Sequence, residues 1–271
     1  MKAAVLGSPV SHSLSPILHN AAYAALNLDH TYSAIEVTES SLGSFLAARD
    51  ANWLGVSLTM PLKEVAFDFA DTCDELSVLT GAINTLVFGS ETKAFNTDVL
   101  GIVDAINETG VEKVSSGVIF GSGATARSSL VALSKLGASE VDCIARNETD
   151  IQRLAVIASE IGVKFKSTSI QDSHWMTTEV VINTTPVGVL DETAREVYAP
   201  AGLLLDVVYD PWPTQLAASW AVTGGKIVSG LSMLLHQAGH QVFLMTGQPA
   251  PIPKMREELN AELVARGLNT I

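Results

Sequence analysis

Short apolar segments alternate with amphipathic ones along most of the chain. Continuous apolar runs are typical of strands buried on both faces of a parallel sheet, and helical segments between them are typical of βα units. The pattern predicts strands over residues 3–6, 31–37, 54–58, 117–120, 140–144, 179–182, 203–209 and 226–228. It predicts helices over residues 17–26, 40–49, 63–70, 99–106, 128–136, 230–243 and 255–266. The fold class is therefore expected to be α/β.

One part of the pattern differs from this alternation. Residues 82–88 and 93–98 are both rich in strand-forming residues, and the four residues between them, 89–92, are typical of a turn. This spacing predicts a β-hairpin.

Length and composition restrict the possible classes of protein. A chain of 271 residues corresponds to about two domains of roughly 150 residues, and a hydrophobic content of 47% is ample for buried cores. The formal net charge is −13, which argues against a nucleic-acid or anionic-membrane partner because such surfaces require clustered Lys and Arg. Any anionic ligand must therefore be held by local donors.

The cysteines and the apolar runs bear on the compartment. Cys73 and Cys143 are far apart and have no metal-ligand spacing, so reduced thiols and no metal site are expected. The apolar run at the start of the sequence is too short for a signal peptide, and no segment approaches the ~20 apolar residues of a membrane span. We expect a cytoplasmic protein.

Hydroxyl groups are concentrated after the first predicted strand. Ser15 followed by Pro16 is typical of a helix start, with serine as the N-cap and proline as the first helical residue. Ser11 and Ser13 lie on the same loop, and His12 between them is expected to be a loop residue. Hydroxyls beside a helix N-terminus form a suitable pocket for a carboxylate, although capping alone accounts for Ser15.

Lys63 follows the strand over 54–58, after a turn at Pro61. Strand-to-helix turns are the usual position of functional groups in open α/β sheets. Lys63 is also the only Lys or Arg between Arg49 and Lys93, in a region rich in Asp and Glu, which makes it a candidate acid–base group. The alternative is a solvated lysine at a helix start.

Polar residues interrupt the apolar runs of the predicted hairpin. Asn84 lies in the first strand, and Asn96 and Asp98 lie at the end of the second. Buried polar side chains are costly without partners, so these residues are expected to contact one another or a ligand. Asp98 could instead be the N-cap of the helix over 99–106.

A glycine-rich turn connects the strand over 117–120 to a helix. Its sequence is G-x-G-x-x-A, beginning at Gly121, which is the context of a dinucleotide pyrophosphate site. Gly121 permits the tight turn, Gly123 permits close approach of the backbone to the ligand, and Ala126 permits close helix packing.

The end of the next strand indicates which dinucleotide is bound. An NAD site has Asp or Glu at this position for the ribose 2′-hydroxyl, whereas this chain has Arg146, which suits a 2′-phosphate. Glu148 is a competing candidate but lies beyond the expected position. The sequence therefore predicts NADP.

In the long helix over 230–243, Gln237 lies four residues after Met233, on the same face. Gln237 is a candidate cleft residue, whereas core packing is the simpler interpretation for Met233 and His236.

Together these segments resemble the shikimate dehydrogenase family across essentially the whole chain. The order of several short motifs is more specific than any one of them. The matching segments are Ser11-His12-Ser13-Leu14-Ser15-Pro16, Thr59-Met60-Pro61-Leu62-Lys63, Gly81-Ala82-Ile83-Asn84-Thr85, Asn96-Thr97-Asp98, the turn at Gly121, Asn183-Thr184-Thr185-Pro186, Asp206-Val207-Val208-Tyr209-Asp210-Pro211 and Gly230-Leu231-Ser232-Met233 with Gln237.

The resemblance implies reversible, NADP-linked reduction of 3-dehydroshikimate to shikimate, a step of chorismate and aromatic amino-acid biosynthesis. It implies Lys63 and Asp98 as the catalytic pair, in which Lys63 either transfers the proton or orients the substrate. The implied substrate-binding residues are Ser13, Ser15, Thr59, Asn84, Asp98, Tyr209 and Gln237. The implied cofactor-binding residues are Gly121, Ser122, Gly123, Ala124, Thr125, Ala126, Arg127, Ala145, Arg146, Asn147, Thr184, Thr185, Pro186, Val207, Gly230 and Met233.

The resemblance also implies an architecture. Residues 1–98 and 232–271 would form a mainly parallel α/β substrate domain, and residues 99–231 a Rossmann-type NADP-binding domain. The C-terminal helices would return to the first domain. The expected partners are small molecules only, in a monomer or homodimer.

Two alternatives remain open at this point. One is a quinate/shikimate dehydrogenase with NAD use, for which Ser15 is the position of interest. The other is a protein that binds NADP without catalysing a reaction.

Overall fold

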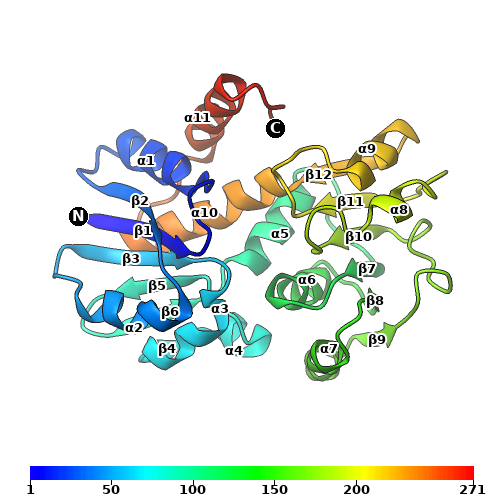
Figure 1. The fold of residues 1–271 in the computed structure, drawn as a ribbon, viewed down its shortest axis with the longest axis horizontal. Coiled ribbons are helices and arrows are strands. Elements are labelled where there is room, and N and C mark those ends of the chain that lie inside the picture. The colour runs from blue at the N-terminus through cyan, green and yellow to red at the C-terminus, as the bar shows by residue number, and fades with distance from the viewer. The chain divides into compact units, whose positions relative to one another are not determined.

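The computed structural model describes all 271 residues, and the chain divides into two compact units (Figure 1). The first unit comprises Met1–Thr97 and Leu234–Ile271, and the second comprises Asp98–Met233. The second boundary lies inside helix α10 (Gly230–Thr246). The α/β fold class is confirmed.

The first unit contains a six-stranded sheet in the order β2-β1-β3-β5-β6-β4. The strands are β1 (Lys2–Gly7), β2 (Thr31–Glu36), β3 (Trp53–Leu58), β4 (Thr72–Cys73), β5 (Thr85–Phe88) and β6 (Thr92–Phe95). Strand β5 is antiparallel to both β3 and β6, and the other pairs are parallel. The predicted hairpin is therefore confirmed, and it inserts one reversed strand into an otherwise parallel sheet.

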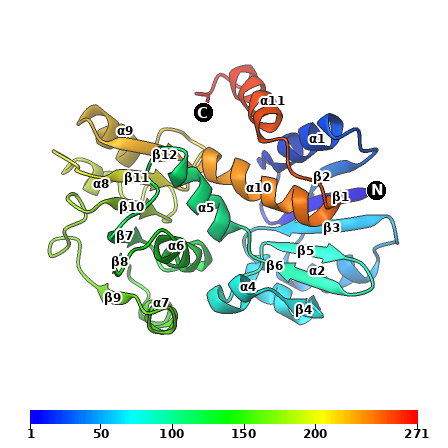
Figure 2. The same ribbon diagram turned by 180° about the vertical axis from the view of Figure 1, so that it is seen from behind.

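Helices and their cores cover both faces of this sheet. The helices are α1 (Ser15–Ala25), α2 (Glu39–Ala47), α3 (Leu62–Val65), α4 (Glu75–Thr80), the 3-10 helix η1 (Ala66–Phe69), α11 (Ile252–Ala265) and most of α10. On one face Leu6 packs with Leu42 of α2, and on the other Val5 packs with Tyr23 of α1 and Met245 of α10. Burial on both faces accounts for the continuous apolar strands. Helix α11 packs on α1, so the C-terminal segment returns to the first unit as expected (Figure 2).

The second unit has a six-stranded sheet in which every pair is parallel. Its order is β12-β11-β10-β7-β8-β9. The strands are β7 (Ser116–Phe120), β8 (Glu140–Ile144), β9 (Lys164–Ser167), β10 (Val180–Asn183), β11 (Leu203–Asp206) and β12 (Lys226–Ser229). The helices are α5 (Asp98–Asn107), α6 (Ala124–Lys135), α7 (Glu148–Glu160), α8 (Asp191–Ala194) and α9 (Gln215–Val222). This order is the doubly wound order of a Rossmann fold, and it reverses between β7 and β10, where such folds bind ligands.

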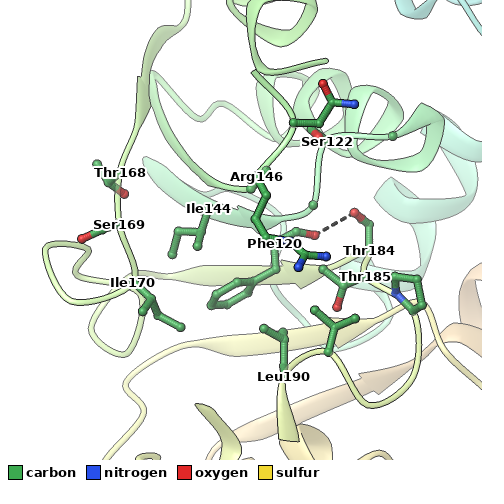
Figure 3. Close-up of a pocket in the computed structure, with 16 residues that line it drawn as sticks. Phe120, Ser122, Ile144, Arg146, Thr168, Ser169, Ile170, Thr184, Thr185 and Leu190 are labelled. Atoms are coloured by element: carbon green, nitrogen blue, oxygen red, sulfur yellow. Dashed lines mark hydrogen bonds between the residues drawn. The ribbon is translucent and has the colours of Figure 1, made fainter. Parts of the chain in front are cut away.

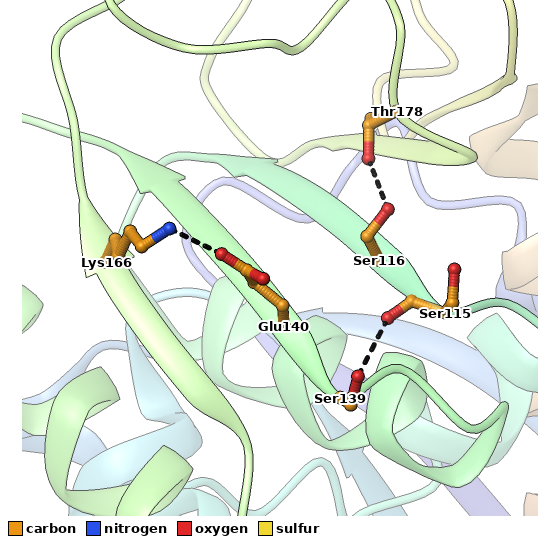
Figure 4. A network of polar contacts seen from close by, with 6 residues as sticks. All are labelled: Ser115, Ser116, Ser139, Glu140, Lys166 and Thr178. Carbon is orange, nitrogen blue, oxygen red and sulfur yellow. Dashed lines mark hydrogen bonds and ion pairs between the residues drawn. The ribbon is translucent and has the colours of Figure 1, made fainter.

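Polar side chains form hydrogen bonds and an ion pair at the amino ends of the strands in the second unit (Figure 4). Ser116 at the start of β7 is 3.1 Å from the Thr178 hydroxyl, and the Ser139 hydroxyl donates to the Ser115 carbonyl at 3.4 Å. Lys166 pairs with Glu140 at 2.5 Å, but both side chains are exposed, so this ion pair adds little stability. The loops that follow the strands lie at the opposite, carboxyl ends.

Six of the seven predicted helix starts differ from the structure by one to four residues, and three of these lie at the candidate sites. Helix α1 begins at Ser15 with Leu14 in the N-cap position, so Ser15 is not the N-cap. The Leu14 carbonyl accepts hydrogen bonds from the amides of Ile17 and Leu18, which moves the helix start one residue earlier. Helix α6 begins at Ala124 rather than residue 128, because Gly123 takes the N-cap position. Asp98 is the first residue of α5 and not its cap.

None of the helices has both the length and the apolar character needed to span a membrane.

Candidate functional site

Sheet topology brings most of the predicted substrate residues of the first unit to one edge. Strands β1, β3 and β6 end at this edge, and the reversed strand β5 begins there. The backbone connects their ends: the Thr59 amide donates to the Leu6 carbonyl at 2.9 Å, and the Ile83 amide donates to the Lys63 carbonyl at 2.8 Å. Segments far apart in the sequence therefore meet at a common edge.

The serine loop follows β1 at this edge. The Ser13 hydroxyl accepts a hydrogen bond from the Ser15 amide at 3.3 Å, so Ser13 rather than Ser15 serves the first turn of α1. Ser15 is 5% exposed and Ser13 is half-buried. The two hydroxyls thus lie at the start of an 11-residue helix, where amides and the helix dipole favour an anion.

Lys63 and Asp98 belong to different units. Lys63 is half-buried in the first turn of α3, directly after β3. Asp98 is 4% exposed at the start of α5, the first element of the second unit. Their action as a catalytic pair therefore stays a prediction.

Asn84 and Gln237 meet in the first unit. The Asn84 Nδ2 atom donates to Thr97 Oγ1 at 2.9 Å and lies 3.4 Å from Gln237 Oε1. Asn84 Oδ1 accepts from the Thr97 amide at 2.9 Å. Both Asn84 and Gln237 are buried, at 2% and 7% exposure. Asn96 Nδ2 donates to Thr80 Oγ1 at 2.8 Å. The hairpin amides therefore have polar partners, and the expectation that they contact one another or a ligand stays a prediction.

His19 lies one turn after Ser15 and is completely buried. Its Nδ1 atom is 3.0 Å from the Ser15 carbonyl, and its ring stacks on Tyr32 with centroids 3.8 Å apart. Burial lowers the pKa of His19 from 6.5 to about 4. Its Nε2 makes no hydrogen bond of normal geometry, although the neighbouring Gln241 side chain opposes the lowering of the pKa. His19 is therefore neutral at pH 7.

The second unit contains a cavity of about 630 Å³ at the carboxyl ends of β7, β8 and β10 (Figure 3). Its lining includes the glycine turn, the end of β8 and the turn after β10. The lining residues are Phe120, Gly121, Ser122, Gly123, Ile144, Ala145, Arg146, Asn147, Thr168, Ser169, Ile170, Thr184, Thr185, Pro186, Val189 and Leu190. The position at the topological switch point is the one expected for a dinucleotide.

Two glycines shape the turn between β7 and α6. Gly121 has φ of 101°, and a Cβ atom there would lie 2.5 Å from Thr184 Oγ1, so the predicted tight turn is confirmed. A Cβ atom on Gly123 would meet nothing within 4 Å, which leaves room for a ligand. The first turn of α6 has no acidic residue, so its amides and dipole are available to a phosphate group.

Arg146 and Asn147 line the cavity, whereas Glu148 does not. Figure 3 shows the Arg146 side chain extending from the end of β8 over the cavity. Asn147 caps α7 by accepting from the Asp150 amide, and Glu148 accepts from Gln152 at 3.0 Å on the outside of that helix. The cation is thus at the cavity and the competing carboxylate is directed away from it.

The loop after β10 is fastened to the glycine turn. The Thr184 amide and hydroxyl both donate to the Phe120 carbonyl, at 2.9 and 2.7 Å. Asn183 accepts from the Thr185 amide and hydroxyl, at 3.0 and 2.7 Å. Thr184 and Thr185 are therefore fixed at the cavity, and Pro186 beside them is exposed.

A buried carboxylate connects this loop to the next one. Asp206 is fully buried and accepts hydrogen bonds from Asn183 at 3.0 Å, Thr214 at 2.6 Å and the Val208 amide at 3.1 Å. Burial raises the pKa of Asp206, and these hydrogen bonds oppose the rise. Asp206 thereby anchors residues 207–214, the loop that carries Tyr209.

Gly230 lies against this loop, because a Cβ atom there would be 2.2 Å from the Val207 carbonyl. Met233 is 8% exposed, in agreement with core packing, so its contact with a cofactor stays a prediction. The remaining turn residues surround the start of α6: Ala124 and Thr125 are half-buried, and Ala126 and Arg127 are buried.

The sequence motifs did not identify seven residues of the cavity wall, among them Phe120 and Ile144 at the ends of β7 and β8. Thr168, Ser169 and Ile170 follow β9, and Val189 and Leu190 precede α8. Their position at the carboxyl edge of a parallel sheet was the only available signal, because no motif marks them.

The fold and these sites define an α/β protein with a Rossmann-type dinucleotide-binding unit and a second polar site at the strand ends of another sheet. Residues 5–86 match the shikimate dehydrogenase substrate binding domain, and residues 230–259 match the shikimate 5'-dehydrogenase C-terminal domain. The chain is 35% identical to the NADP(+) shikimate dehydrogenase of Methanococcoides burtonii over 262 residues, which cover 94% of this chain and 95% of the relative. The chain belongs to the shikimate dehydrogenase family.

Solved structures agree with this assignment. The crystal structure of Mycobacterium tuberculosis shikimate dehydrogenase superposes with a TM-score of 0.89 at 40% identity, covering 96% of this chain and 99% of the other. The shikimate 5-dehydrogenase of Thermus thermophilus, solved in complex with NADP(H) and shikimate, gives a TM-score of 0.85 at 29% identity and covers 96% and 99% of the two chains. The family expected from the motifs is confirmed.

The two turn glycines should respond differently to substitution. Gly121→Ala combines a left-handed backbone with a 2.5 Å contact to Thr184 Oγ1, so we expect a loss of about 1–3 kcal/mol of stability. Gly123→Ala meets open space and should cost less than about 1 kcal/mol. Urea denaturation of both variants measures this difference, and equal losses of stability would contradict the different surroundings of the two glycines.

His19 should make stability depend on pH. The folded-state pKa of His19 is depressed to about 4, whereas the unfolded value is 6.5. The contribution of neutral His19 to the free energy of unfolding is therefore fully present above pH 6.5 and is lost as the pH falls toward 4. The total effect is about 3 kcal/mol at 1.36 kcal/mol per pH unit. The stacked Tyr32 and nearby Tyr23 do not titrate in this range, because the ordinary tyrosine pKa of 10.0 already lies above it and burial raises the pKa of each further.

Urea denaturation between pH 4 and 7 should therefore show a shallower slope for His19→Gln than for the wild type. His12→Gln is the matched control, because His12 is exposed. A slope unchanged by His19→Gln would refute the assignment.

Proposed function

We propose that the chain catalyses the reversible, NADPH-linked reduction of 3-dehydroshikimate to shikimate. The observation that carries this proposal is the family membership across at least nine-tenths of the chain, together with the meeting of the motif residues at one sheet edge. The acid–base and polar groups that the reaction needs are present in that set.

The substrate is held by the first unit in this proposal. Ser13 and Ser15 at the start of α1 bind the carboxylate, and Tyr209 assists from the second unit. Thr59, Asn84 and Gln237 bind the ring hydroxyls and the reacting carbonyl. The proposed set therefore combines an anion site with neutral hydrogen-bonding groups, as a hydroxylated ring carboxylate requires.

NADP, when bound, supplies or accepts the hydride, and the cavity of the second unit is its proposed position. The glycine turn and the start of α6 accommodate the pyrophosphate, and Arg146 with Asn147 accommodates the 2′-phosphate. Thr184, Thr185, Pro186, Val207, Gly230 and Met233 complete the proposed contacts. The fit rests on the open space beside Gly123 and on the cation at the end of β8.

Lys63 is the proposed proton donor in the reducing direction. Reduction places negative charge on the carbonyl oxygen, and an ammonium group can neutralise it by donating a proton or a hydrogen bond. Asp98 is its proposed partner and a ligand of the adjacent hydroxyl. We further propose that the protein acts in the cytoplasm as a monomer or homodimer.

The direct test is the absorbance of NADPH formed from NADP and shikimate, with NAD and with quinate in parallel reactions. We expect turnover with NADP and shikimate to exceed the other combinations. The absence of turnover in both directions would refute the proposed activity, and equal rates with quinate would favour the broader specificity.

Removing the Lys63 ammonium should impair the chemical step. For Lys63→Met we expect kcat to fall about 100-fold to 10,000-fold, while the KM for shikimate changes little. Lys93→Met is the control, because Lys93 is an exposed residue of β6 in the same sheet. A Lys63→Met enzyme with near-normal kcat would exclude Lys63 from the mechanism.

Removing the Arg146 guanidinium should weaken NADPH selectively. A charge-assisted hydrogen bond contributes about 1.5–3 kcal/mol, so Arg146→Ala should raise the KM for NADPH about 10-fold to 100-fold and leave that for NADH nearly unchanged. Glu148→Gln should alter neither constant, because Glu148 is bonded to Gln152 away from the cavity. An equal effect of Arg146→Ala on both cofactors would contradict the 2′-phosphate assignment.

A further inference from the structure

A buried chain of hydrogen bonds leads through the first unit to the Asn84 amide. The Tyr32 hydroxyl donates to Ser57 Oγ at 2.6 Å, and the Ser57 hydroxyl donates to Gln241 Oε1 at 2.8 Å. Gln241 Nε2 donates to Thr85 Oγ1 at 3.0 Å, and the Thr85 hydroxyl donates to Asn84 Oδ1 at 2.8 Å. Every donor in this chain points in the same direction, toward Asn84.

The side chains of this hydrogen-bond chain are all buried. Thr85 and Gln241 are 0% and 1% exposed, and Tyr32 and Ser57 are each 4% exposed. A buried polar group left without a partner costs about 1–3 kcal/mol, so reversal of one member would disturb those on either side. The hydrogen-bond chain can therefore reverse only as a whole, and the Thr97 amide prevents this because it can only donate to Asn84 Oδ1.

The fixed direction determines which end of the Asn84 amide faces Gln237. Asn84 Oδ1 accepts from the Thr85 hydroxyl and from the Thr97 amide, which cannot become an acceptor. Oδ1 must therefore stay on that side, and Nδ2 is directed to Thr97 Oγ1 and Gln237 Oε1. The Nδ2–Oε1 distance of 3.4 Å is long, so this contact is weak.

We infer that Thr85, supported by Gln241, Ser57 and Tyr32, is a positioning residue that keeps the Asn84 amide with its N–H donor facing the substrate. The site then presents a donor from Asn84 beside an acceptor from Gln237. A ligand hydroxyl that replaces the weak Asn84–Gln237 contact would satisfy both, because it accepts a hydrogen bond from Asn84 Nδ2 and donates one to Gln237 Oε1. This inference rests on the proposed function for the identity of the substrate, but not for the orientation of the amide.

Two substitutions of Thr85 separate its hydroxyl from its methyl group. Thr85→Val keeps the volume and removes the hydroxyl, whereas Thr85→Ser keeps the hydroxyl and removes the methyl. For Thr85→Val we expect the KM for shikimate to rise about threefold to tenfold, the effect of one misaligned hydrogen bond, with kcat within about twofold. For Thr85→Ser we expect wild-type KM, although the small cavity should lower Tm by about 2–4 °C.

Two further variants test the chain and the specificity of the effect. Gln241→Met replaces the side-chain amide, with its Oε1 acceptor and Nε2 donor, by an apolar side chain of similar length. This variant should raise the KM for shikimate as Thr85→Val does. Tyr23→Phe is the control, since Tyr23 is an equally buried hydroxyl that contacts only Met245 Sδ, at 4.0 Å. It should leave the KM unchanged.

The orientation itself can be measured without turnover. In ligand-free protein, the side-chain amide protons of Asn84 should exchange slowly by NMR in the wild type and in Thr85→Ser, and at least about tenfold faster in Thr85→Val. Unchanged exchange in Thr85→Val, or an equal rise in KM for Thr85→Ser and Thr85→Val, would overturn the inference. Altered exchange in a protein that does not turn over shikimate would support the inference and refute only the proposed function.

Discussion

The carboxyl ends of parallel strands must lie at the same edge of a sheet, and both candidate sites follow from this constraint. In the second unit it brings the glycine turn after β7, Arg146 after β8 and Thr184 after β10 around one cavity. In the first unit it brings the serine loop after β1 and Lys63 after β3 to one edge. Strand β5 is antiparallel, and for that reason Asn84 precedes its strand instead of following it.

A second constraint acts within each site, because the polar groups gathered at a sheet edge are buried and must be paired. In the second unit Asp206 meets this requirement by accepting hydrogen bonds from Asn183, Thr214 and Val208, which joins two loops. In the first unit Gln241 has the same function between β3 and β5. Asp206 and Gln241 are both buried, and each joins segments that carry candidate ligand-binding residues. Stability and site geometry therefore depend on the same hydrogen bonds.

The sequence predicted the fold well where the signal was local. The apolar runs located β8 at its exact bounds, and the glycine turn was located from its spacing alone. Helix starts were less accurate, because Ser15 resembles an N-cap while the backbone hydrogen bonds select Leu14. A one-residue shift of this kind depends on the path of the preceding loop, which the local sequence does not encode.

The residues that the sequence did not reveal have long-range partners. Gln241 and Ser57 are 184 positions apart, and neither has a local pattern that distinguishes it from an ordinary polar residue of a helix or strand. Ile170 and Leu190 line the cavity only because β9 and α8 are placed there by the sheet order. Motifs identify groups with distinctive chemistry, whereas residues that position those groups become visible only when distant segments are placed together.

The net charge sets a further condition on recognition. The chain has 29 acidic and 16 basic residues, yet the proposed ligands are anions. Because exposed charges beyond about 8 Å are largely screened at physiological ionic strength, the groups next to the ligand decide the sign of the local field. At the cavity these are Arg146 and the start of α6, whose first turn has no acidic residue, while Glu148 is bonded to Gln152. An acidic protein can therefore bind an anionic dinucleotide without a basic surface, provided that helix dipole and guanidinium lie at the strand ends where the sheet places them.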